Sequence, residues 1–167
     1  AWLRIVVWAW LAGCGGGSET VPWHADLAPA AQMGVRRGLT PARGIVHLHS
    51  AYSHDACDGE PRDANGVPNE PCIMHLLDAL CTTSMDFAAL TDHGTSMADE
   101  DWGPPLFVAR GADELVLGQN GLPVASRLLC ADGRRVLVFV GGENALMPVM
   151  LNEHPPGDVT TRHGIYS

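Results

Sequence analysis

The chain has 167 residues, which is enough for one domain with a hydrophobic core. Its formal net charge is −9, and every basic residue is an arginine. An acidic chain of this kind does not bind nucleic acid by broad neutralisation of phosphates, so no such partner is expected. Because the first residue is not Met, we expect a fragment of a longer protein, truncated at both ends.

The first residues predict an export signal. Arg4 precedes an apolar run at residues 5–12, which is far shorter than the ~20 residues of a membrane-spanning helix. Residues 11–14, Leu-Ala-Gly-Cys, resemble the lipobox of bacterial lipoproteins. This resemblance implies that residues 1–13 are a signal peptide and that Cys14 carries the lipid. The alternative is a buried N-terminal strand with Cys14 as an ordinary core residue.

Export sets the expected location of the protein. Residues 14–43, rich in Gly and Pro, predict a flexible tether and an irregular lead-in. Gly15, rather than Asp, follows the lipobox cysteine. We therefore expect a protein of the bacterial cell envelope, anchored in the outer membrane and facing the periplasm or the exterior. It would touch the membrane through its lipid anchor only.

Residues 44–167 predict a domain in which strands alternate with helices. Short apolar runs predict strands, helical spacing of apolar residues predicts helices, and Asp-Gly between two apolar runs predicts a hairpin. This order of elements favours an α/β fold. The expected elements are a strand at 44–49, a loop at 51–71, a helix at 72–81, a strand at 86–91, a loop at 94–103, a helix at 106–117, a hairpin of 124–130 and 134–140, and mostly loop at 141–167.

Residues able to bind a metal ion follow three of the predicted strands. His47 and His49 lie two apart at the end of the first strand and therefore share a face. His93 follows the second strand, and Glu143 follows the third. Strand ends of this kind are where α/β folds keep their chemistry. For the first pair the alternative is two unrelated histidines near a strand end, because His-x-His alone is a weak signal.

The residue types in this set indicate the kind of ion. Imidazole and carboxylate ligands suit zinc, manganese or iron. The candidate ligands exceed what one tetrahedral ion needs, so we expect two or three divalent ions bridged by a carboxylate. Glu143 is the expected bridge, and Asp92 is placed to orient a metal-bound imidazole. We expect Glu143 and Asp92 to be the catalytic residues.

Three segments resemble the motifs of the PHP family, the polymerase and histidinol phosphatase family. They are residues 47–55 (His-Leu-His-Ser-Ala-Tyr-Ser-His-Asp), 89–93 (Ala-Leu-Thr-Asp-His) and 140–143 (Val-Gly-Gly-Glu). The resemblance implies metal ligands at His47, His49, Asp55, His93 and Glu143. It also makes His154 an expected ligand, since relatives often carry a His soon after the Glu, and His163 a weaker one. The late Asp-x-His motif of the family has no counterpart in this chain.

The same resemblance implies a fold and a reaction. Residues 44–167 would be the opening part of a distorted (β/α)7 barrel, truncated at its C-terminus. The reaction would be hydrolysis of a small-molecule phosphoester by a metal-bound hydroxide. Two alternatives remain open: a non-catalytic, metal-stabilised binding domain of the envelope, and a protein for metal acquisition or storage.

The cysteines other than Cys14 predict disulfides. Cys57, Cys72, Cys81 and Cys130 are an even number, which in an exported chain favours disulfides over the alternative of free buried thiols. No Cys-x-x-Cys spacing supports a zinc site. Of the three possible pairings, we predict Cys57 with Cys72, which closes the loop between the first strand and the first helix, and Cys81 with Cys130.

Overall fold

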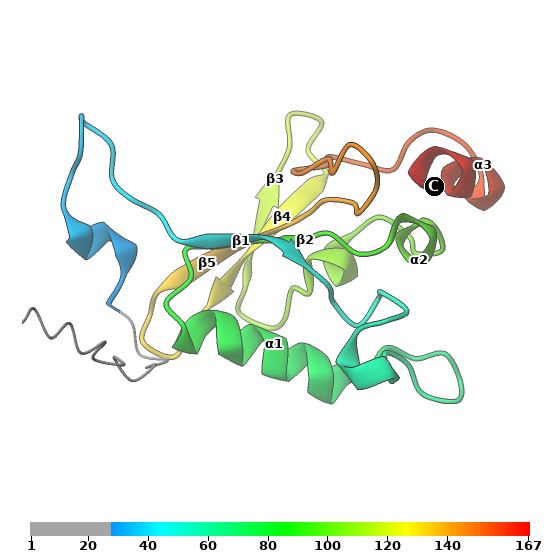
Figure 1. Cartoon of the computed structure of the whole chain (residues 1–167), viewed down its shortest axis with the longest axis horizontal. Coiled ribbons are helices and arrows are strands. Elements are labelled where there is room, and N and C mark those ends of the chain that lie inside the picture. Colours follow the sequence, from blue (N-terminus) through cyan, green and yellow to red (C-terminus); the bar gives the residue numbers. More distant parts are fainter. Residues whose placement is uncertain (1–27) are drawn as a thin grey trace, which may run out of the picture.

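The computed structural model describes residues 28–167, which form a mixed α/β domain (Figure 1). The signal peptide, Cys14 and the first part of the tether and lead-in, up to residue 27, therefore lie outside the described residues. One mixed sheet has the strand order β1-β2-β5-β4-β3. Its strands are β1 (Gly44–Leu48), β2 (Phe87–Leu90), β3 (Glu114–Leu117), β4 (Pro123–Leu129) and β5 (Arg135–Val140), and the helices are α1 (Glu70–Thr82), α2 (Gly94–Ala98) and α3 (Val159–Tyr166).

Three neighbouring strands of this sheet are parallel, as the resemblance to a (β/α)7 barrel implies. β1 pairs with β2, and β2 pairs with β5, both in parallel register. β4 and β5 form the predicted antiparallel hairpin. Its turn contains Gly133 in a left-handed conformation, and the Asp132 carboxylate accepts the N–H of Arg134 at 3.0 Å. The Asp-Gly signal of the sequence therefore marks a real hairpin turn.

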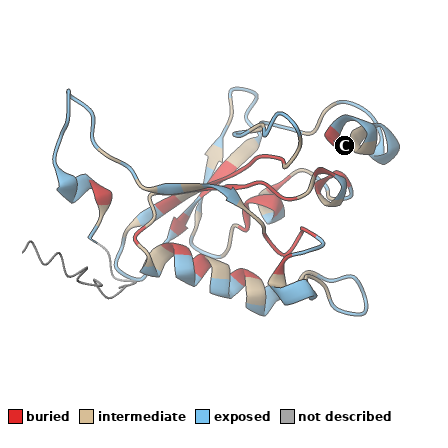
Figure 2. Cartoon of the chain, in the orientation of Figure 1, coloured by how far each residue is buried: buried red, intermediate tan, exposed pale blue. Residues whose placement is uncertain are grey.

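Helix α1 confirms the helix predicted at 72–81. Asn69 caps its first turn by accepting the Cys72 N–H at 3.2 Å. Ile73, Leu77 and Leu80 are the buried residues of the helix, at the spacing that places side chains on one face. That face packs against the sheet (Figure 2).

The hydrophobic core lies mainly on the α1 side of the sheet. There α1, the 3₁₀ turn at Pro104–Phe107 and the sheet bury a cluster that includes Leu90, Phe107 and Val138. The opposite face of the sheet carries a smaller cluster built around Ala89, Ala125 and Phe139. The face of the sheet that packs against α1 is therefore the better covered of the two.

The helix predicted at 106–117 is wrong. Pro104–Phe107 is a short 3₁₀ turn, Gly111 has a left-handed backbone, and residues 114–117 form β3. Asp113 helps to hold the turn between them, since its carboxylate accepts the Arg110 N–H at 2.9 Å. Leu115 and Leu117 alternate as strand residues do, and antiparallel pairing with β4 selects the strand.

Two short helices occupy segments that the sequence predicts as loops. α2 starts directly after His93, within the predicted loop 94–103, and buries Met97 and Ala98. α3 lies near the end of the segment predicted as mostly loop, and Asp158 caps it by accepting the Thr161 N–H at 2.9 Å. The residues between β5 and α3 lack regular helix or strand, as predicted.

The sheet is open within residues 28–167, where β1 and β3 form its two edges. These residues do not close into a (β/α)7 barrel, so the part of the fold prediction that the structure confirms is the α/β class with its parallel strands. None of the described helices has the length and hydropathy needed to cross a bilayer.

Both predicted disulfides are present. Cys57 and Cys72 are bonded with their Cα atoms 5.8 Å apart, and Cys81 and Cys130 with theirs 5.6 Å apart. The first closes the loop between β1 and α1, and the second joins the end of α1 to the β4–β5 turn. Each bond restricts the unfolded chain and so favours the folded state.

Candidate metal centre

The carboxyl ends of β1, β2 and β5 lie side by side at the same end of the sheet, because these strands are parallel neighbours. Backbone pairing continues beyond the strands. The Gly141 N–H donates to the Leu90 carbonyl at 2.8 Å, and the Glu143 N–H donates to the Asp92 carbonyl at 3.1 Å. His93 and Glu143 form a parallel bridge pair. The segments that carry the candidate ligands therefore stay side by side.

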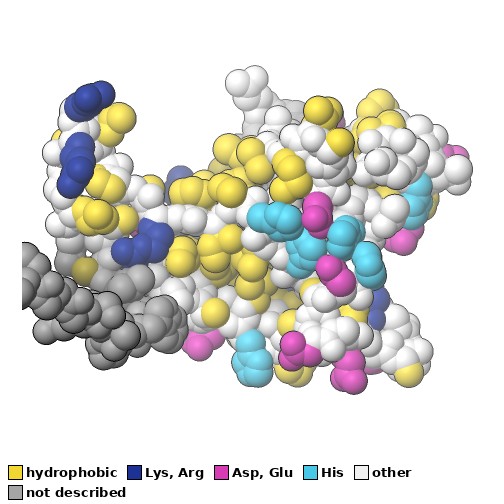
Figure 3. Space-filling view, viewed as in Figure 1, with side chains coloured by type: hydrophobic (Ala, Val, Ile, Leu, Met, Phe, Trp, Pro, Cys, Tyr) yellow, Lys and Arg dark blue, Asp and Glu magenta, His cyan; other side chains and the backbone are white. Residues whose placement is uncertain are grey.

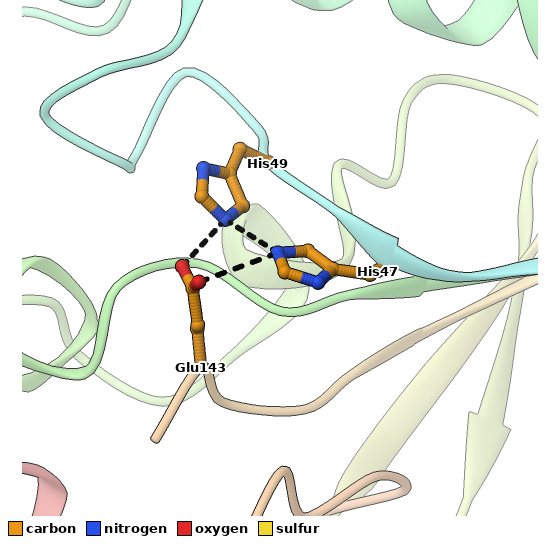
Figure 4. Close-up of side chains that lie close together, drawn as sticks. All are labelled: His47, His49 and Glu143. Carbon is orange, nitrogen blue, oxygen red and sulfur yellow. Dashed lines mark hydrogen bonds and ion pairs between the residues drawn. The ribbon is translucent and has the colours of Figure 1, made fainter. Parts of the chain in front are cut away.

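Two histidines and a glutamate converge in a first group (Figure 4). His47 Nε2 lies 3.3 Å from His49 Nε2 and 3.5 Å from Glu143 Oε1. His49 Nε2 lies 2.9 Å from Glu143 Oε2. A tetrahedral ion with ligands at roughly 2.0–2.2 Å separates its ligand atoms by roughly 3.3–3.6 Å. The two separations measured from His47 Nε2 fall in this range, and the separation from His49 Nε2 to the other carboxylate oxygen is shorter.

A second group joins the first through His49. Asp55 Oδ1 lies 2.9 Å from His49 Nδ1, and Asp55 Oδ2 lies 3.1 Å from His93 Nε2. His93 Nδ1 lies in turn 3.2 Å from Glu143 Oε2. The five ligands that the PHP resemblance implies from His47 to Glu143 are therefore brought together in one patch on the surface (Figure 3).

His49 presents a different ring nitrogen to each group. Its Nε2 faces Glu143, and its Nδ1 faces Asp55. When Nε2 binds an ion, Nδ1 carries the proton and donates it to the carboxylate, which is the usual carboxylate–histidine pairing around metals. Asp55 therefore orients His49 as well as being a candidate ligand through its second oxygen.

Glu143 supplies the strongest sign that the cluster suits a cation. Its Oε2 atom is buried and has no hydrogen-bond partner among the described residues. Yet Oε2 lies within 3.2 Å of nitrogens on both His49 and His93, without hydrogen-bond geometry to either. Buried carboxylate oxygens are ordinarily hydrogen-bonded or bound to a cation. The donor set, three imidazoles and two carboxylates, fits zinc, manganese or iron.

Exposure differs across the cluster. The side chain of His47 is 50% exposed, that of Glu143 29% and that of His49 19%. Solvent reaches the cluster from the His47 side and also from the Asp55 side, where the Asp55 side chain is 43% exposed. The Ser53 hydroxyl donates to Asp55 at 2.7 Å, and this bond together with the neighbouring histidines holds the pKa of the Asp55 carboxyl well below its usual range. Asp55 is thus kept in the charged form that a metal ligand requires.

The Asp92 carboxylate contacts Ser50, and not the imidazole that the sequence leads us to expect. Its two carboxylate oxygens accept the Ser50 N–H at 2.6 Å and the Ser50 hydroxyl at 2.8 Å, not an imidazole. Burial raises the pKa of Asp92, and the bonds from Ser50 oppose that rise. Asp92 therefore ties the end of β1 to the end of β2, so it positions the backbone around His49 and His93. Sequence reasoning missed Ser50 and Ser53, although both lie between the candidate ligands.

His154 lies outside both groups, contrary to its predicted role as a ligand. Its Nε2 donates to the Glu100 carbonyl at 2.8 Å, and its Nδ1 accepts the Tyr166 hydroxyl at 3.0 Å. Both nitrogens are thus engaged by the protein, and burial lowers the pKa of the ring. His163, the weaker candidate, pairs with Asp99 at 2.7 Å on the α2–α3 side.

His54 borders the cluster without joining it. Its ring lies 4.6 Å from that of His93, between centroids, and its Nδ1 is 3.4 Å from the Ser96 hydroxyl. Neither candidate group includes His54. The position of His54 beside Asp55 in the sequence therefore does not by itself make it a ligand.

Two hollows flank the cluster. One of about 540 Å³ is lined by His49, the Cys57–Cys72 disulfide and His75. The other, of about 410 Å³, is lined by Tyr52, His54 and Arg62. A hollow of 560 Å³ between α1 and β4 is lined by none of the candidate ligands, so we do not assign it to the candidate metal centre.

Comparison with known proteins identifies no relative. No family model, no curated protein and no solved structure matches this chain.

Proposed function

We propose that this chain is a metal-dependent hydrolase that acts on phosphoesters, of the kind that the PHP resemblance implies. The observation that carries the proposal is the convergence of His47, His49 and Glu143, with nitrogen–oxygen separations of 3.5 and 2.9 Å, at a carboxylate whose buried Oε2 has no hydrogen-bond partner within residues 28–167. His93 and Asp55 extend the cluster enough for a second ion. Zinc, manganese and iron are the metals that this donor set favours, and we expect two or three ions.

Glu143 would be the central ligand. Its Oε1 faces His47, while its Oε2 lies between His49 and His93, so one carboxylate touches all three imidazoles. Such a carboxylate is placed to bridge two cations and to offset their mutual repulsion. Asp92 and Ser50 would hold the strand ends in register and would not touch the substrate.

Divalent ions held here would supply two things: a lower pKa, near ~7, for a water molecule, and neutralisation of charge on the phosphoester oxygens. The protein would orient His49 through Asp55 and keep Asp55 charged through Ser53. Half-exposed His47 leaves one side of the cluster open to a substrate. No other nucleophile is required from the chain.

We further propose that the open sheet is the opening part of a distorted (β/α)7 barrel in a lipid-anchored envelope protein. The parallel order β1-β2-β5, with ligands at all three strand ends, supports the barrel. The two disulfides are compatible with an oxidising compartment outside the cytoplasm. Mass spectrometry of the mature N-terminus tests the anchor, because we expect a lipid on Cys14 and loss of residues 1–13.

The proposed function is tested by measuring the metal content and the rate of ester hydrolysis of the same full-length preparation. Elemental analysis gives ions per chain, and release of p-nitrophenol gives hydrolysis of p-nitrophenyl phosphate and of bis(p-nitrophenyl) phosphate. We expect two or three ions and turnover that chelation abolishes. The His163→Gln variant is the matched control, because His163 pairs with Asp99 and belongs to neither ligand group. Bound metal without turnover of either ester would favour a metal-stabilised binding domain, and a metal-free protein would reject both functions.

A further inference from the structure

Ser53 places a buried hydroxyl between the candidate ligands His49 and Asp55. The residue is 0% exposed, and its backbone N–H donates to the Ser50 carbonyl at 3.0 Å. A serine hydroxyl has one hydrogen to donate and two lone pairs that accept. Because this hydroxyl is shielded from solvent, the protein has to supply its hydrogen-bond partners. Those partners therefore show what the hydroxyl holds in place.

The Ser53 hydroxyl contacts all three members of the second ligand group, which are His49, Asp55 and His93. It donates to Asp55 Oδ1 at 2.7 Å and accepts the backbone N–H of His93 at 3.4 Å. The same oxygen lies 3.5 Å from His49 Nδ1. One buried oxygen thus links three segments of the chain that carry candidate ligands.

The two carboxylate oxygens of Asp55 have different surroundings. Oδ1 accepts the Ser53 hydroxyl and also faces His49 Nδ1 at 2.9 Å. Among the described residues, Oδ2 faces only His93 Nε2, at 3.1 Å. The bond from Ser53 therefore leaves Oδ2 as the oxygen that is available to an ion. It also restrains a side chain that is 43% exposed and would otherwise be free to turn toward solvent.

Ser53 differs from the other partners of the Asp55 carboxylate in one respect. Within residues 28–167, those other partners are His49 and His93, which are candidate ligands themselves. An imidazole nitrogen that binds an ion has no proton to donate to a carboxylate. The Ser53 hydroxyl keeps its proton whether or not ions are bound. It can therefore hold Asp55 in both states.

The first ligand group is less dependent on Ser53. In the described part of the chain, the Ser53 hydroxyl makes no hydrogen bond to His47 or Glu143. His49 belongs to both groups, but its Nε2 is turned toward Glu143, and Figure 4 shows its other ring nitrogen pointing away from that carboxylate. Only the second nitrogen lies near Ser53. The two groups therefore share His49 but not the contact with the buried hydroxyl.

We propose that Ser53 is a positioning residue that holds Asp55 and His93 in place and so sets the affinity of the second ligand group for its ion. The proposal rests on the proposed function and states which ion of the centre depends on a residue that binds none. Removing a hydrogen bond to a metal ligand typically lowers metal affinity about 10–100-fold. We expect that loss at the second group and little change at the first.

Calorimetric titration of the metal-free, full-length protein with Zn²⁺ gives a Kd for each ion that binds. We expect Ser53→Ala to raise one Kd by about 10–100-fold and to leave the other within about threefold of wild type. Ser126→Ala is the matched control, because Ser126 is also buried and donates its hydroxyl to the Phe107 carbonyl at 3.0 Å, but lies on β4 outside both ligand groups. Both variants should shift the midpoint of denaturant unfolding by similar amounts, whereas only Ser53→Ala should change Zn²⁺ binding.

Two further backgrounds assign each ion to its group. Asp55→Asn leaves the ion of the first group to be measured, and adding Ser53→Ala should not change its Kd. His47→Gln leaves the ion of the second group, and adding Ser53→Ala should raise its Kd by about 10–100-fold. A purely structural role would weaken both ions alike. Equal weakening in the two backgrounds, or unchanged Kd values in both, would overturn the proposal.

Turnover of p-nitrophenyl phosphate by the same preparations separates this inference from the proposed hydrolase. Selective weakening of one ion in Ser53→Ala, without turnover by wild type, keeps the role of Ser53 and rejects the phosphoesterase. Turnover by wild type, with the same Zn²⁺ Kd values in Ser53→Ala, rejects the role of Ser53 and keeps the phosphoesterase. A protein that binds no Zn²⁺ rejects both.

Discussion

Two histidine clusters on the same domain behave differently. Around Glu143, nitrogens of three histidines approach carboxylate oxygens, and Glu143 Oε2 has no hydrogen bond to any of the described residues. Around His154, both ring nitrogens have a partner, in the Glu100 carbonyl and the Tyr166 hydroxyl. Burial raises the pKa of Tyr166 to about 12, which keeps its hydroxyl protonated as the donor to His154. Among residues 28–167, a buried carboxylate oxygen of the first cluster is left without a hydrogen bond, whereas both ring nitrogens of His154 in the second are hydrogen-bonded.

This difference teaches that a histidine close to the candidate ligands in sequence need not join them, because a ring can bind an ion only through a nitrogen that the protein leaves free. His154 follows Glu143 by eleven residues, and the family resemblance makes it an expected ligand in addition to His93. The structure engages His154 in joining the segment before α3 to the segment after α2. It leaves the nitrogens of His93 facing two carboxylates.

The largest expected effect comes from Glu143→Gln. The amide keeps the shape of the side chain but removes its negative charge, so ions at His47, His49 and His93 would repel one another without compensation. Changing a residue that only hydrogen-bonds to a metal ligand typically costs 10–100-fold. We expect turnover to fall by more than that, because Glu143 is a candidate ligand itself. Metal content and turnover measured together check this. His154→Gln, in the second cluster, should keep its metal, and full activity of Glu143→Gln would refute the catalytic hypothesis.

The next largest effect should come from removing the Cys57–Cys72 disulfide, which should affect the Glu143 cluster but not the His154 cluster. Asp55 lies just before this disulfide, whereas the His154 cluster is not part of the loop that it closes. Replacing both cysteines by serine opens a loop of 15 residues and should lower the free energy of unfolding by ~3 kcal/mol. Denaturant unfolding measures this loss. We also expect weaker metal binding, and unchanged metal affinity would show that the loop does not hold Asp55 in place.

A smaller effect should appear as a pH dependence of the His154 cluster. Burial lowers the pKa of His154 below its usual 6.5, opposed by the Glu100 carbonyl and Asp101 and assisted by Arg162. The unfolded chain therefore binds the proton more readily than the folded one. The stability from neutral His154 is present above about pH 6.5 and is lost as the pH falls through the folded pKa.

Comparing wild type with His154→Gln checks this pH dependence. At pH 7.5 the variant should lose about 1 kcal/mol of unfolding free energy, because it lacks one or both hydrogen bonds. The deficit should shrink as the pH is lowered to 5. A deficit that is constant or grows toward low pH would contradict a lowered pKa for His154.

The smallest effect should be that of His54→Ala. His54 stacks beside His93 and contacts Ser96, but it belongs to neither ligand group. We expect turnover within about twofold of wild type, whereas Asp55→Asn should lose metal and most activity. Loss in His54→Ala with none in Asp55→Asn would mean that the third ligand is one residue earlier than we place it.

Much of the site was predictable because its parts are local in the sequence. Alternation along β1 puts His47 and His49 on one face, and a buried apolar strand precedes both His93 and Glu143. Parallel neighbours then bring the strand ends together. The disulfide pairing was also predictable, since Cys57 and Cys72 flank one loop. The structure of residues 106–117 was not predictable. Their apolar residues fit the spacing of a helix as well as that of a strand, and pairing with β4 selects the strand.

The sequence by itself thus determined the α/β class, the three parallel strands, the order of candidate ligands and the two disulfides, all of which follow from local patterns and chain connectivity. Only the tertiary structure decided which polar groups meet. Asp92 binds Ser50, 42 residues away, and His154 binds the Glu100 carbonyl, 54 residues away. A side chain's hydrogen-bond partner depends on which segments pack together, and no local pattern in the sequence records that choice.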